Sequence, residues 1–220
     1  MQRLVDIFHI KIDNEQLFKQ ALTHTSYTKE QNLEYTQSYE RLEFLGDAVL
    51  KLAISDILYR KYEEYSEGDL SKIRSIVVSD AVLFEISEKI GLSKLIILGS
   101  HEQNCRKIES VCACAFEAVL GAYYLDGKYK ELILFIENYF NSYIEDVDKN
   151  FEKFNAKAIL QEHTQSLNKK TPDYKLINEL GPAHKRIFEV EVSYNGKILA
   201  SGTGKTKKDA EQHAAYNACK

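Results

Sequence analysis

Proline is nearly absent from this chain of 220 residues, which has only Pro172 and Pro182. No helix before Pro172 is therefore forced to break at a proline. No uninterrupted apolar run approaches the roughly 20 residues that span a bilayer, and the N-terminus lacks the basic start and long apolar stretch of a secretory signal peptide. Four cysteines are too few for a disulfide scaffold and fit a reducing compartment. We therefore expect a cytoplasmic protein with no membrane association.

Charge is unevenly distributed along the chain, whose net charge is −4. Residues 156–220 contain 11 Lys and Arg against 7 Asp and Glu, a net +4, and the rest contains 18 against 26, a net −8. Ordinary compositional scatter is one explanation. The other is an acidic part that uses a metal, joined to a basic part that binds a polyanion.

The apolar periodicity divides the chain into two domains of different kinds, which makes the fold class α+β. Residues 1–148 have helical periodicity, and turn signals separate the segments. The segments expected to be helices are 14–22, 38–63, 69–78, 80–90, 109–125 and 129–146. The short polar stretch 149–155 is the expected linker.

Residues 156–220 show a different pattern, in the order α-β-β-β-α. A helix is expected near 156–167, strands over 174–177, 187–192 and 197–200, and a final helix from Lys207. The sequence Tyr194-Asn195-Gly196-Lys197 is typical of a tight hairpin turn between the last two strands.

One run in the first domain, Glu40 to Leu50, reads ERLEFLGDAVL. At 100° per residue, Glu40, Glu43 and Asp47 share one narrow helix face. The leucines and valine at 42, 45, 49 and 52 are expected on the opposite face. A solvated acidic face is the simpler interpretation, but carboxylates grouped in this way repel one another and match the oxygen ligands that Mg²⁺ prefers.

This run resembles the hallmark segment of bacterial ribonuclease III, and three further segments resemble that family in its order. They are Ala21 to Ser26, Glu67 to Lys72 and Phe116 to Gly121, and the last sixty-odd residues resemble a double-stranded RNA-binding domain. The resemblance covers nearly the whole chain. It implies an all-α ribonuclease III nuclease domain over 1–148 and a double-stranded RNA-binding domain over 156–220.

The resemblance also implies an activity: hydrolysis of phosphodiester bonds in double-stranded RNA with Mg²⁺, or with Mn²⁺. It assigns metal binding to Glu43, Asp47 and Glu117, and catalysis to Asp47 and Glu117. Glu40 and Glu67 match acidic residues with accessory roles. The implied substrates are precursors of ribosomal and messenger RNA.

The sequence departs from the family pattern at Cys114, which occupies the position of a metal-binding aspartate three residues before Glu117. A thiolate suits Zn²⁺ or Cu⁺, whereas Mg²⁺ prefers carboxylate oxygen and water. Two possibilities follow. The chain is a nuclease that works with three of the four acids, or it is a dimeric protein that binds duplex RNA and is impaired in cutting it.

The second domain is expected to contact RNA through six residues that match the family's positions: Gln161, Glu162, His184, Lys205, Lys207 and Lys208. The lysines cluster at the expected start of the last helix, where backbone N–H groups already favour phosphate. The nearby Gly202-Thr203-Gly204-Lys205-Thr206 is not a P-loop, because Leu199 stands where that motif requires glycine. No nucleotide cofactor is expected.

The family works as a homodimer, and Phe44 matches the residue that packs into the partner subunit. A two-fold dimer would place two acidic sites across one duplex. His24 is expected to make structural hydrogen bonds near a helix end.

Overall fold

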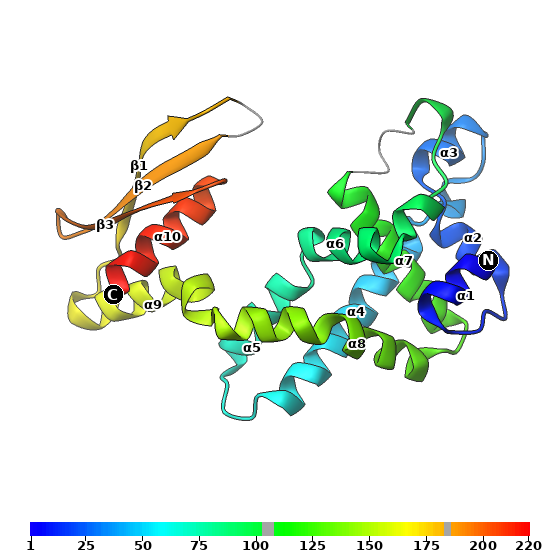
Figure 1. Ribbon diagram of the computed structural model, residues 1–220, viewed down its shortest axis with the longest axis horizontal. Coiled ribbons are helices and arrows are strands. Elements are labelled where there is room, and N and C mark those ends of the chain that lie inside the picture. The colour runs from blue at the N-terminus through cyan, green and yellow to red at the C-terminus, as the bar shows by residue number, and fades with distance from the viewer. Residues whose placement is uncertain (103–107, 183–185) are drawn as a thin grey trace. The chain divides into compact units, whose positions relative to one another are not determined.

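The computed structural model describes residues 1–102, 108–182 and 186–220, and the chain forms two compact units, Met1–Asp146 and Val147–Lys220 (Figure 1). In the described residues, no helix combines the length and apolar character needed to cross a membrane.

The first unit is helical, as the periodicity predicts. Its elements are α1 (Gln2–Phe8), α2 (Glu15–Ala21), α3 (Thr25–Glu30), the 3-10 helix η1 (Tyr35–Gln37), α4 (Glu40–Lys61), α5 (Glu67–Val77), α6 (Asp80–Ile90), the 3-10 helix η2 (Leu92–Leu95), α7 (Glu109–Leu125) and α8 (Tyr129–Lys149), whose last three residues belong to the second unit. All six expected helices are present. The short helices α1 and α3 were not expected.

The helix α7 is the centre of the first unit, with 11 of its 17 residues buried. It packs against α2, α4 and α6 (Figure 1). Its sequence is rich in alanine and apolar residues and has a single acid, Glu117, after the first turn. A helix that is apolar on nearly all sides is stable only when other elements surround it.

Two glycines allow α4 and α7 to touch backbone to backbone. A Cβ atom on Gly46 would lie 1.7 Å from the carbonyl oxygen of Glu117, and one on Gly121 would lie 2.3 Å from that of Leu42. Neither glycine has a positive φ, so both are needed for space and not for backbone conformation. The crossing therefore places the acids of α4 directly beside α7.

The buried face of α4 differs from the expected one. Leu42 and Val49 are buried, but Leu45 is only partly buried and Leu52 is 58% exposed. The buried face includes Gly46, Leu50 and Ala53, because α7 packs at the glycine. The acidic residues consequently border the buried face and do not lie opposite to it.

The second unit consists of α9 (Phe151–Asn168), β1 (Asp173–Leu180), β2 (Ile187–Tyr194), β3 (Lys197–Gly204) and α10 (Lys207–Cys219). The strands form an antiparallel sheet in the order β1-β2-β3. Its core comprises Ala156, Leu160, Val192, Ala214 and Ala215. Asn195 and Gly196 both have positive φ, as the predicted tight turn requires.

The stretch predicted as a linker, 149–155, is mostly helical, because α9 already begins at Phe151. Lys149 ends α8, and only Asn150 separates the two helices. Polar composition suggested an irregular segment, but Phe151 and Phe154 are partly buried and give this stretch an apolar side. The domain limits themselves stay a prediction.

The backbone contact at Gly46 gives a first testable prediction. Replacing Gly46 with alanine should force α4 and α7 apart and lower the free energy of unfolding by roughly 3 kcal/mol, as overpacking does in other buried sites. Urea denaturation followed by circular dichroism measures this change. The control is Gly68→Ala in α5, where the nearest atom would be 3.7 Å from the new Cβ. If both variants unfold at the wild-type urea midpoint, the contact does not hold the helices together.

Candidate active site

The acids of the first unit converge where α4 and α7 cross. Glu43 and Asp47 lie one turn apart on α4 and flank Gly46. Glu117 lies on α7, and its own carbonyl is the group that faces Gly46. The glycine contact therefore places the backbone of Glu117 against the segment of α4 that carries Glu43 and Asp47.

Glu117 is the most perturbed carboxyl of this cluster. Burial, followed by the negative charges of Asp47, Glu43 and Asp80, raises its pKa from 4.5 to about 8. Its carboxylate has no hydrogen bond or ion pair with any of the residues that the structure describes. Burial also raises the pKa of Glu43, and the charges of Glu40, Asp47 and Asp80 act in the same direction. Without a cation, Glu117 therefore keeps its proton at neutral pH, because burial and the neighbouring acids disfavour its charged form.

Cys114 lies inside this cluster, at the position where the sequence departs from the family pattern. A hydrogen bond with Cys114 lowers the pKa of Glu43, opposing the effect of burial. Burial, followed by the charge of Glu43, holds the pKa of the Cys114 thiol far above its usual range. The thiol is therefore neutral at physiological pH. It donates a hydrogen bond to an acid but contributes no negative charge.

Buried aromatic and polar groups hold the start of α4. The backbone N–H of Tyr39 donates to the carbonyl of Thr23, and the Tyr39 hydroxyl makes a hydrogen bond with Cys114. His24 is the N-cap of α3 and accepts from the Ser26 backbone N–H at 3.1 Å. The hydrogen bond of His24 is thus structural, as expected. His24 lies at the start of α3, three residues after the end of α2 at Ala21.

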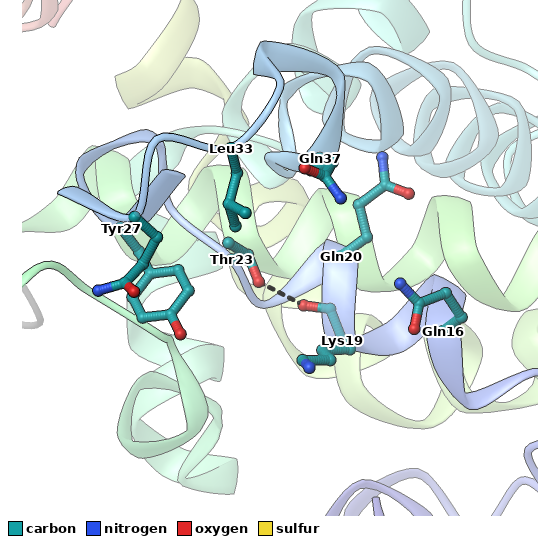
Figure 2. Close-up of a pocket in the computed structure, with 8 residues that line it drawn as sticks. Gln16, Lys19, Gln20, Thr23, Tyr27, Leu33 and Gln37 are labelled. Carbon is teal, nitrogen blue, oxygen red and sulfur yellow. Dashed lines mark hydrogen bonds between the residues drawn. The ribbon is translucent and has the colours of Figure 1, made fainter. Parts of the chain in front are cut away.

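A polar pocket of about 360 Å³ lies next to this region (Figure 2). Gln20 in its wall donates to the carbonyl oxygens of Thr36 and Ser38, just before α4, and Thr23 donates to the carbonyl of Lys19. No acid lines the pocket. The hydrogen bonds of Gln20 hold the segment that leads into α4, and the pocket shares no lining residue with the acidic cluster.

The other two predicted acids are Glu40 and Glu67. The charge of Glu40, the first residue of α4, acts on Glu43. Glu67 opens α5 and accepts a hydrogen bond from Ser71 at 2.8 Å, but it does not perturb Glu43 or Glu117. The structure therefore brings Glu40 to the cluster and does not show Glu67 there.

The donor types fit a hard divalent cation, because Glu43, Asp47 and Glu117 all offer carboxylate oxygens and the charges of Glu43 and Asp47 act on Glu117. In their present orientations, no three His, Cys, Asp or Glu side chains of the described residues are grouped to hold an ion. Asp47 is turned to Lys51, 2.7 Å away, and Glu43 interacts with Cys114. Rotation of these flexible side chains is what a bound cation would require.

Asp80 is a member of the cluster that the sequence did not reveal. It is the first residue of α6, after the N-cap Ser79, and its charge acts on Glu43, Cys114 and Glu117. An acid at the start of a helix is common for reasons of helix electrostatics alone. Only the packing of α6 against α7 distinguishes this one.

In the second unit the predicted RNA-binding residues are exposed. Lys207 and Lys208 begin α10, and Lys205 precedes its N-cap, Thr206. Lys207 also pairs with Glu179 at 3.4 Å. Gln161 and Glu162 are exposed on α9. His184 lies outside the described residues.

Comparison with known proteins identifies the class that this fold and acidic cluster define. A model of the family described as ribonuclease-III-like matches residues 14–144, and one of the double-stranded RNA binding motif matches residues 156–220. Curated relatives include Ribonuclease 3 of Bacillus licheniformis, 41% identical over 95% of this chain and 84% of the relative. Ribonuclease 3 of Streptococcus mutans is 41% identical over 99% and 94%.

Solved structures agree with these relatives. The nuclease domain of ribonuclease III from Campylobacter jejuni is 30% identical, with a TM-score of 0.57 over 64% of this chain and 98% of that one. Dicer from Pichia stipitis is 26% identical, with a TM-score of 0.50 over 96% and 95%. The chain belongs to the ribonuclease III family.

The raised pKa of Glu117 predicts a pH-dependent stability for the metal-free protein. Between the ordinary value of 4.5 and about 8, the folded state keeps a proton that the unfolded chain has released. The free energy of unfolding should therefore fall as pH rises through this window, and Glu117→Gln should make the fall smaller. Urea midpoints in EDTA at pH 5, 6.5 and 8 measure the slope. An equal slope in both proteins would contradict the assignment.

Proposed function

We propose that this chain is an endoribonuclease that hydrolyses phosphodiester bonds in double-stranded RNA with a divalent metal ion. The observation that carries the proposal is the placement of Glu43, Asp47 and Glu117 at the α4–α7 crossing, where burial and the charges of Asp47 and Glu43 raise the pKa of Glu117 to about 8. The match of residues 156–220 to the double-stranded RNA binding motif supports the substrate class.

In this proposal Glu43, Asp47 and Glu117 hold Mg²⁺, or Mn²⁺ in its place. When bound, the cation supplies an activated water and stabilises charge on the phosphate. Asp47 and Glu117 are the acids next to the reacting phosphate. Lys51 is paired with Asp47 in the metal-free protein, and a cation on that carboxylate would compete with this ion pair.

The second unit supplies affinity for the duplex. Lys205, Lys207 and Lys208 are exposed around the start of α10 and meet phosphates there. Gln161 and Glu162 reach the minor groove, where recognition depends on A-form shape and 2′-hydroxyls more than on base identity. We assign His184 to the same surface by family pattern alone. The natural substrates in this proposal are precursors of ribosomal and messenger RNA in the cytoplasm.

Phe44 points to a homodimer. Its aromatic side chain is 82% exposed on α4. It borders a groove of about 630 Å³ whose other apolar residues are Leu17, Tyr35, Leu42, Leu45 and Leu125. A side chain and a matching groove on the same surface suit a two-fold interface, in which each subunit fills the groove of the other. The nuclease domain of ribonuclease III from Campylobacter jejuni has a region involved in dimer formation.

Replacing Phe44 with aspartate should convert the dimer to a monomer, because each carboxylate would be buried in an apolar groove. Light scattering coupled to gel filtration measures the mass. The control is Tyr59→Asp, which changes another exposed aromatic residue of α4, 75% exposed and about four turns away. A wild-type protein that is monomeric at micromolar concentration would contradict the dimer proposal.

The second candidate function is duplex binding without efficient cleavage, and the observation that favours it is the neutral thiol of Cys114. The site then lacks one negative charge and one oxygen ligand compared with the family pattern. The retained Glu43, Asp47 and Glu117 favour the enzyme, because a protein that only binds RNA has no need of repelling acids in a half-buried cluster.

Cleavage of a long RNA duplex with Mg²⁺ distinguishes the two functions. We expect wild-type protein to cut, Glu117→Gln to lose cleavage while still binding the duplex, and Cys114→Asp to cut at least as fast as wild type. Cys114→Ser is the matched control, because it changes the thiol for a neutral hydroxyl of similar size. If Cys114→Asp alone cuts, with equal duplex binding by both proteins, the natural chain is a binding protein.

A further inference from the structure

The neutral thiol of Cys114 leaves the acidic cluster with one carboxylate fewer on α7 than the family pattern has. Thiols are poor ligands for Mg²⁺, which prefers oxygen. A metal site with Glu43, Asp47 and Glu117 alone would have one negative charge and one oxygen ligand fewer than the family pattern. A fourth acid, on a different helix, has a charge that acts on this cluster.

That acid is Asp80, and the geometry of α6 directs it to the cluster. Leu83 and Ser87 are buried on the side of α6 that packs against α7, and the Ser87 hydroxyl donates to the Cys112 carbonyl at 3.4 Å. Asp80 lies one turn before Leu83 and two turns before Ser87, on the same face of the helix. Asp80 is therefore the first residue on the face of α6 that packs against α7.

Asp80 is also available for a ligand. Its side chain is exposed, and no hydrogen bond or ion pair joins its carboxylate to another residue in the described parts of the chain. The Ser79 side chain, at the N-cap of α6, makes no capping hydrogen bond. The charge of Asp80 acts on Glu43, Cys114 and Glu117, and this places it within electrostatic reach of acids from both other helices.

We propose that Asp80 supplies the carboxylate that the cluster lacks at Cys114, binding the divalent cation directly or through one of its waters. The inference rests on the proposed function, since it concerns the same metal site. Asp80 thereby compensates from α6 for an acid lost from α7, so its contribution should depend on which residue occupies position 114.

The test is a comparison of Mn²⁺ binding in the absence of RNA, from the free Mn²⁺ signal in electron paramagnetic resonance. Asp80→Asn should weaken Mn²⁺ binding by roughly 10- to 100-fold, the range found when supporting groups of metal sites are removed. In a Cys114→Asp background, the same change should have an effect of less than about threefold. Glu88→Gln is the matched control, because it removes one exposed charge from α6 two turns further on.

The outcomes separate this inference from the proposed function. Mn²⁺ binding that is lost in Glu117→Gln but unchanged in Asp80→Asn would overturn the role of Asp80 and leave the metal site intact. An equal loss from Asp80→Asn and Glu88→Gln, or an equal loss with either residue at position 114, would also overturn it, because general charge would then explain the effect. A wild-type protein that binds no Mn²⁺ would contradict the inference and the proposed function together.

Discussion

The backbone contact between α4 and α7 is the constraint on which the first unit depends. Gly46 and Gly121 leave no space for a side chain, so the two helices touch at main-chain atoms. This contact has two consequences. It buries the apolar face of α7 in the centre of the unit, and it brings Glu117 within reach of the charges of Glu43 and Asp47. Stability and the proposed chemistry therefore have the same origin, and a change at either glycine affects both.

The electrostatics of the cluster oppose folding in the absence of a cation. Burial first, and then the charges of Asp47, Glu43 and Asp80, raise the pKa of Glu117 to about 8, so charging this carboxyl in the folded state is costly. Metal binding would relieve this repulsion and release the proton, so metal affinity and pH are coupled. Cys114 reduces the repulsion because its thiol is neutral, at the expense of a ligand. In our proposal, the carboxylate of Asp80 supplies the negative charge that the Cys114 thiol does not.

The sequence predicted the elements better than their contacts. Periodicity located the long helices, the Asn195-Gly196 turn defined the last hairpin, and helical spacing placed Glu43 and Asp47 on one face. The prediction of the buried face of α4 was wrong at Leu52, which is exposed. The packing of α7 at Gly46 decides which face is buried, and this tertiary contact has no signal in the local sequence. Asp80 was missed for a similar reason: it lies 37 residues from Glu43 along the chain, and only the packing of α6 on α7 joins them.

The most direct measurement for the central claim is anomalous diffraction from crystals of the protein grown or soaked with Mn²⁺. The cluster at the α4–α7 crossing predicts an anomalous peak among the carboxylates of Glu43, Asp47 and Glu117, with the Asp47 side chain turned away from Lys51. A protein that binds duplex RNA but shows Mn²⁺ elsewhere, with Asp47 still paired to Lys51, would contradict it.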